Sequence, residues 1–174
     1  MNSIIIANAL RFFGLVILQV LILKRVTLGS TDGFNYVQIL LYPLFLMLLP
    51  FRTPRWMGVL LGFSIGFLVD IFYGSLGVHA AAGTFTGFIR PFVLDILAPK
   101  AGYVVSASPT MHKLGTNWFL RYSALMTFLH LFFYYSVDAF TFVYIADILL
   151  KTIFSFIFTM VFVVIYQYLL DPQE

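Results

Sequence analysis

Residues 58–91 read GVLLGFSIGFLVDIFYGSLGVHAAAGTFTGFIRP, an apolar run that is interrupted by glycines, an aspartate, a histidine and an arginine. These residues are poor choices for a simple membrane anchor, because glycine weakens an isolated helix and ionisable groups are costly in hydrocarbon. Their nearly helical spacing indicates that they shape contacts between helices. The rest of the chain shows what kind of protein these helices belong to.

The chain is far more apolar than a soluble domain. Of its 174 residues, 61% are hydrophobic and only 10% are charged, and about 20 apolar residues are enough for a helix to cross the hydrocarbon layer. The longest polar connection, from about Ala98 to Asn117, leaves no room for a separate soluble domain. We therefore predict one polytopic membrane domain over residues 1–174, with neither a soluble catalytic unit nor a nucleic-acid-binding surface.

Six apolar segments are visible, and helix is predicted for each because a backbone in lipid must satisfy its own hydrogen bonds. The fold class is thus all-α, a bundle of six transmembrane helices. The second segment is short and carries Pro43 at its middle, which predicts a kink. The segments are Ile4–Leu23, Tyr36–Leu49, Trp56–Phe72, His79–Leu97, Phe119–Tyr135 and Ile145–Leu170.

The placement of positive charge predicts the orientation. An even number of spans puts both termini on one side, and cytoplasmic loops of membrane proteins carry an excess of lysine and arginine. The termini are therefore expected in the cytoplasm. Six basic residues lie on that side (Arg11, Arg52, Arg55, Lys100, Lys113 and Arg121), against three on the other (Lys24, Arg25 and Lys151).

The third segment carries a ridge of small residues. Gly58, Gly62, Gly66 and Asp70 recur every fourth residue, so they lie along one side of a helix and drift by about 40° per step. Small residues at this spacing let another helix approach closely. The ridge is predicted to be a contact surface, either with another helix of this chain or with a partner protein.

The fourth segment carries a second such surface. His79, Gly83, Thr86, Gly87 and Arg90 fall within about 80° of one another on a helix, so this stripe is expected to face protein. Arg90 precedes a proline that frees a backbone carbonyl. Its guanidinium is predicted to pair with backbone, with a carboxylate, with a partner or with a lipid phosphate, the simplest option being that it extends to the headgroups.

Asp70 and His79 flank the turn Tyr73–Gly77 at the predicted outer end of the third and fourth segments. A tight hairpin leaves unpaired N–H groups at the start of the second helix, and a carboxylate within reach accepts from them. These polar contacts are therefore expected to fasten the hairpin. The alternative, a proton relay or cation site, needs further ionisable groups across the membrane, and none is evident.

Catalytic motifs are absent from the sequence. There is no metalloprotease helix, phosphate loop or serine-nucleophile motif with a partner histidine, and the three histidines lack metal-ligand spacing. Without cysteine, disulfides and thiolate metal sites are excluded. The sequence predicts a protein that is not an enzyme and needs no metal or cofactor.

The run from Gly62 to His79, followed by Gly83 and Gly87, resembles the signature of the MreD family of bacterial rod-shape-determining membrane proteins. That signature is a glycine-bearing helix ending in Asp, a Gly-Ser-Leu-Gly type of turn, and a small-residue helix with a second glycine pair. The match covers about Trp56–Pro91. The remainder agrees only in length, span number and short termini.

The resemblance implies a non-catalytic scaffold in the bacterial inner (cytoplasmic) membrane, a small subunit of the cell-elongation machinery that builds the lateral wall. Such a protein associates with the bitopic coiled-coil protein MreC, and through it with the glycosyltransferase RodA, its penicillin-binding transpeptidase and, indirectly, the MreB filament. It also implies helices arranged like the substrate-binding subunits of energy-coupling-factor transporters. The alternative function is such a vitamin-type transport subunit, with a small-molecule pocket near Asp70 and His79.

Overall fold

The computed structural model describes residues 2–26, 37–75, 77–100, 102–104, 107–141 and 143–170, with side chains from Ile6 onward. Within these ranges the chain is built of helices, which confirms the predicted all-α class. The long helices are α1 Asn2–Leu21, α3 Arg55–Tyr73, α4 Val78–Ile96, α6 Thr116–Ala139 and α7 Ile145–Leu170, and the short ones are the 3-10 turn Leu23–Arg25, α2 Leu44–Met47 and α5 Met111–Leu114.

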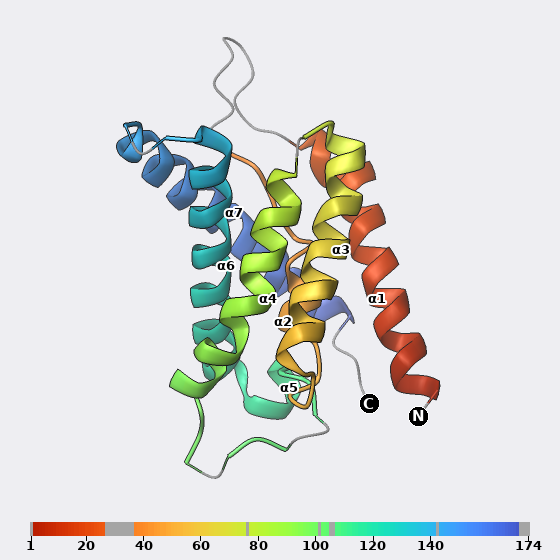
Figure 1. Cartoon of the computed structure of the whole chain (residues 1–174). Coiled ribbons are helices and arrows are strands. Elements are labelled where there is room, and N and C mark those ends of the chain that lie inside the picture. The colour runs from red at the N-terminus through yellow and green to blue at the C-terminus, as the bar shows by residue number, and fades with distance from the viewer. Residues whose placement is uncertain are drawn as a thin grey trace.

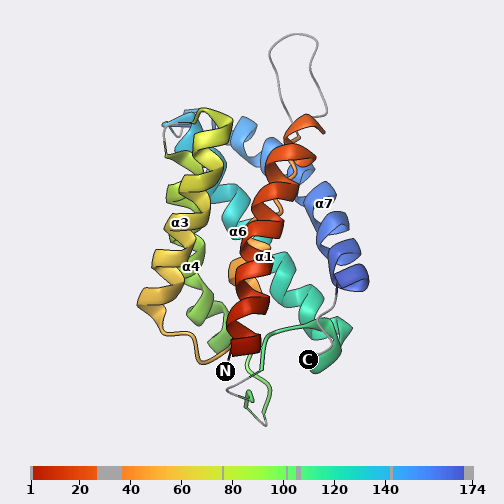
Figure 2. The same ribbon diagram turned by 90° about the vertical axis from the view of Figure 1, so that its right-hand side faces the viewer.

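The long helices form one bundle in which α1, α3 and α6 run in one direction and α4 and α7 run in the other (Figure 1). Helix α1 begins and α7 ends at the same end of this bundle, which we call the terminal end, and α3 and α4 are joined at the opposite, hairpin end (Figures 1 and 2). Among the described residues, three stretches are long and apolar enough to cross a membrane: Ile6–Arg25, Arg55–Tyr73 and Ile145–Leu170. Their outward faces expose large apolar side chains such as Ile17, Phe67 and Ile157, as expected for helices that face lipid.

The prediction of a helix over Tyr36–Leu49, kinked at Pro43, was wrong for most of the segment. Tyr36 lies outside the described residues, residues 38–41 have no regular secondary structure, and α2 contributes only four helical residues. Fourteen helical residues would rise only about 21 Å, short of the roughly 30 Å hydrocarbon layer, whereas an extended chain advances about 3.3 Å per residue. We call residues 37–49 the central segment, since it runs through the interior of the bundle (Figure 1).

Side chains of neighbouring helices satisfy the backbone of the central segment. Gln19 of α1 donates from Nε2 to the carbonyl of Ile39 at 3.0 Å and accepts at Oε1 from the N–H of Leu41 at 2.7 Å. On α7, Ser155 and Thr159 accept from the N–H groups of residues 38 and 40 at 3.0 and 3.3 Å. Non-helical backbone at membrane depth is tolerated only when protein surrounds it, and the central segment meets that condition because only Gln38 among its residues is not fully buried.

The connection between α4 and α6 folds back against the terminal end of the bundle. The N–H of Phe51 donates to the carbonyl of Ala107 at 3.0 Å, and the ring of Tyr103 stacks on that of Phe51 with centroids 4.2 Å apart. The Tyr103 hydroxyl donates to the carbonyl of Leu94 at 2.8 Å. Burial raises the pKa of Tyr103 to about 12, so the phenol keeps this proton to a higher pH than an exposed tyrosine would.

Candidate functional site

Helices α3 and α4 meet along their glycines. Gly62 lies against Gly83, Gly58 against Gly87, and Gly66 against the backbone of His79. A Cβ atom added to Gly62 or Gly66 would lie closer than 3.0 Å to a backbone carbonyl of α4. This separation is too short for a Cβ atom, so a larger residue would force the two helices apart. All five glycines are buried inside the chain, so any surface that binds a partner lies elsewhere. We call this set of pairs the glycine contact.

Asp70 holds the start of α4 from the end of α3. Its Oδ1 accepts from the N–H of His79 at 3.1 Å, and its Oδ2 accepts from the N–H of Ala80 at 2.8 Å. The residue at the N-cap position, Gly77, has no side chain to do this, so a carboxylate from the preceding helix replaces the usual cap. Asp70 also accepts from the Ser75 hydroxyl in the turn. The carboxylate thus ties together both helices and the turn between them.

The trio of Asp70, Ser75 and His79 does not have the geometry of a catalytic triad. A triad histidine bonds the carboxylate with one ring nitrogen and the nucleophile with the other. Here Nδ1 of His79 faces both Asp70 Oδ1 and Ser75 Oγ, each at 2.9 Å, whereas Nε2 is buried without a hydrogen-bond partner among the described residues. The ring is enclosed by the rings of Tyr73 and Tyr134, with centroids 4.7 and 4.9 Å away. This arrangement serves to fix the hairpin.

The remaining polar residues of the α4 stripe also face the interior of the bundle. Thr86 Oγ1 lies 2.7 Å from Nδ1 of His130 on α6. Arg90 is only 4% exposed, and its Nη2 donates to the carbonyl of Leu49 at the end of the central segment. Arg90 thus pairs with backbone, which was one of its predicted partners.

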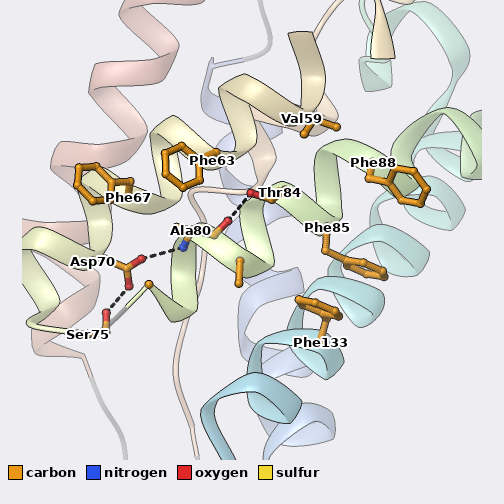
Figure 3. Close-up of a pocket in the computed structure, with 12 residues that line it drawn as sticks. Val59, Phe63, Phe67, Asp70, Ser75, Ala80, Thr84, Phe85, Phe88 and Phe133 are labelled. Atoms are coloured by element: carbon orange, nitrogen blue, oxygen red, sulfur yellow. Dashed lines mark hydrogen bonds between the residues drawn. The ribbon is translucent and has the colours of Figure 1, made fainter. Parts of the chain in front are cut away.

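A groove of about 900 Å³ opens on the side of the α3–α4 pair. Figure 3 shows its small residues, among them Ala80 and Thr84, between aromatic rings that come from α3, α4 and α6. The walls are half-exposed, since Phe63, Phe67 and Phe88 have 48, 49 and 56% of their surface free. The groove therefore opens outward from the bundle, and we call it the lateral groove.

Sequence reasoning did not find the lateral groove or the residues that hold the central segment. The groove depends on which sides of α4 and α6 are brought together, and no spacing in the sequence shows this. Gln19, Ser155 and Thr159 are polar residues within strongly apolar helices, and this alone indicates that they face protein and not lipid. Their targets are backbone groups on a segment far away in the sequence, which a residue pattern does not specify.

The described side chains offer no group of three histidine, aspartate or glutamate residues able to hold a metal ion. The arrangement can therefore be described as two features: a hairpin fixed by the glycine contact and by Asp70, and a lateral groove beside it. Comparisons of the chain with protein-family models, with curated proteins and with solved structures find no match.

Proposed function

We propose that the chain is a membrane-embedded scaffold that holds a single transmembrane helix of a partner in the lateral groove. The observation that carries the proposal is the groove itself, with small residues at its floor and phenylalanines at its walls. Helices associate in membranes by packing side chains into such surfaces next to small residues. The glycine contact and the Asp70 cap keep the α3–α4 pair rigid, so the groove is preformed.

In this proposal the chain crosses the membrane six times, with the central segment as the second crossing. Helices α1 and α3 run in the same direction in Figure 1, and the central segment that leads from one to the other passes through the bundle, which supports this path. The terminal end carries Arg52, Arg55, Lys100 and Arg121 on the loops and helix ends there, and positive loops favour the cytoplasmic side. We therefore place both termini in the cytoplasm and the protein in a bacterial inner membrane.

The identity of the partner rests on the resemblance of residues 56–91 to the MreD signature. We propose that the occupant of the lateral groove is the transmembrane helix of an MreC-type coiled-coil protein, and that the complex includes a RodA-type glycosyltransferase with its transpeptidase and, indirectly, MreB. The chain would then act in cell-shape maintenance without chemistry of its own. The engagement of Asp70, Ser75 and His79 with one another supports a structural role over a catalytic one.

The alternative is a substrate-binding subunit of a vitamin-type transporter. Such a subunit needs free polar groups that converge on an enclosed pocket. The polar atoms of Asp70 in the lateral groove already accept hydrogen bonds from the turn and from the start of α4, and most of the other lining is apolar. These features favour a partner helix over a polar small molecule.

The proposal is tested by filling the groove with a bulky side chain. Ala81 lines the groove, whereas Ala146 is an exposed alanine at the start of α7. Co-purification of an MreC-type partner from the native membrane is expected to fall at least about tenfold with Ala81→Phe and to stay unchanged with Ala146→Phe, since tenfold corresponds to roughly 1.4 kcal/mol of lost contact. Retention of the partner by folded Ala81→Phe protein would contradict the proposal, and recovery of a bound small molecule in place of a partner would support the transporter alternative.

A further inference from the structure

Arg90 carries a buried positive charge that the described residues do not neutralise. The side chain is 96% buried, Nη2 donates to a backbone carbonyl, and the guanidinium also interacts with the Tyr122 hydroxyl. Its Nε is buried and has no hydrogen-bond partner among the described residues. A buried cation is stable only if it is paired, because burial strips its hydration. Among the described residues, Arg90 thus has one donor without a hydrogen-bond partner and a charge without an ion-pair partner.

Arg90 lines a pocket of about 240 Å³ between the start of α3 and the last turns of α4. Arg55, the first residue of α3, lines the same pocket, as does the Thr53 side chain just before the helix. Helix α3 has Pro54 at its N-cap, which supplies no side-chain acceptor, so the positive end of the helix dipole also faces this region. Two guanidinium groups, a hydroxyl and a helix start meet at one pocket.

Asp95 also lines this pocket, but it does not compensate Arg90. It is exposed, and the ion pairs formed among described residues do not join it to Arg90. The two residues are five positions apart on α4, which places them on different faces of the helix. An anion that enters beside Asp95 therefore meets an Arg90 that has no ion-pair partner among the described residues.

The surroundings of the pocket indicate that it opens at the depth of lipid headgroups. The guanidinium of Arg55 lies over the ring of Phe92 at 5.4 Å, and Trp56 next to it is 66% exposed. Exposed aromatic residues beside cationic groups are typical of the membrane interface. The proposed cytoplasmic leaflet is also the one that carries anionic lipids.

We propose that this pocket binds the phosphate group of an anionic glycerophospholipid, with Arg90 and Arg55 as its cationic ligands and Thr53 as a hydroxyl donor. The acyl chains lie along the exposed apolar faces of α3 and α4. This site is separate from the lateral groove, and it rests on the membrane orientation proposed above but not on the scaffold role. It gives the terminal end of the bundle a fixed lipid next to the end of the central segment, because Arg90 also binds Leu49.

The test uses the full-length protein in mixed micelles that contain equal amounts of phosphatidylglycerol and phosphatidylcholine, with the bound lipids counted by native mass spectrometry. The parent is expected to retain phosphatidylglycerol preferentially. Arg55→Gln should lower that preference about fivefold, as roughly 1 kcal/mol per basic residue predicts, and Arg90→Gln should lower it at least as much. Arg121→Gln, an exposed arginine at the start of α6, is the matched control and should leave it unchanged.

Arg55 is exposed, so Arg55→Gln keeps the test valid if Arg90→Gln fails to fold. Inorganic phosphate added as a competitor distinguishes a lipid phosphate from a soluble one. Persistence of the preference in excess phosphate supports the lipid, and full displacement would overturn the lipid assignment. Equal preference in the parent and in Arg55→Gln, or an equal loss in Arg121→Gln, would overturn the site.

Discussion

Gly62 of α3 and Gly83 of α4 lie so close together that a Cβ on either would come within 3.0 Å of the other's backbone. This contact determines how closely the two helices approach, and the pairs Gly58–Gly87 and Gly66–His79 extend it along both helices. The lateral groove lies beside the same helix pair. Its shape therefore depends on a contact in which no side chain takes part.

Gly62→Ala is expected to destabilise the protein, although alanine is the better helix former. The added methyl meets a backbone carbonyl that cannot rotate away, and such overpacking costs about 1–3 kcal/mol. The control is Gly14→Ala on α1, where a Cβ meets nothing within 4 Å. Thermal unfolding in detergent should show a lower midpoint for Gly62→Ala and an equal or higher one for Gly14→Ala. Equal midpoints for Gly62→Ala and the parent would show that α3 and α4 can move apart without loss of stability, which would contradict the role of the glycine contact.

Asp70→Ala should destabilise the hairpin more than Ser75→Ala does. The first substitution removes the carboxylate that accepts from two N–H groups at the start of α4, and the loss of such a cap costs about 0.5–2 kcal/mol of stability. The second substitution leaves both bonds in place. Hydrogen exchange of residues 78–81, followed by mass spectrometry, measures the effect locally. Faster exchange confined to Asp70→Ala is the expected result. Similar exchange in both variants would contradict the capping role.

Gln19→Leu should be among the most destabilising changes outside the hairpin. Gln19 makes bonds to Ile39, Leu41, Tyr42 and Tyr73, and at about 1 kcal/mol for each bond the loss reaches roughly 3–4 kcal/mol. Asn8→Leu, on the same helix, removes only a long bond to Arg11 at 3.4 Å. The yield of monodisperse protein in detergent should fall for Gln19→Leu alone. A normal yield and midpoint would show that the central segment does not need this side chain.

The sequence predicted the hairpin well because its determinants are local. Glycines at every fourth position, an aspartate at the end of one helix and a short turn imply both a close helix pair and a carboxylate near the next helix start. In the structure, Asp70 lies where that reasoning placed it and bonds the N–H groups of His79 and Ala80. The three long apolar helices are consistent with the predicted membrane localisation. The specific membrane, the side of the termini, the partner and the cellular role stay predictions.

The central segment was not predicted because its conformation is set by residues far away in the sequence. Its apolar composition fits a buried helix and a buried extended chain equally well. Its short length and Pro43 argued against a regular span, but the extended form also requires Gln19, Ser155 and Thr159 to replace helical hydrogen bonds. Which side chains face that backbone follows only from the packing of α1 and α7 around it.

Site-specific photo-crosslinking in the native membrane tests the scaffold proposal most directly. A photoreactive amino acid is placed either at Thr84 in the lateral groove or at Ile157, which is 51% exposed on the outer face of α7. The account predicts that position 84 crosslinks to the transmembrane helix of an MreC-type protein and that position 157 crosslinks only to lipid. A partner crosslinked at position 157 and not at position 84 would contradict it.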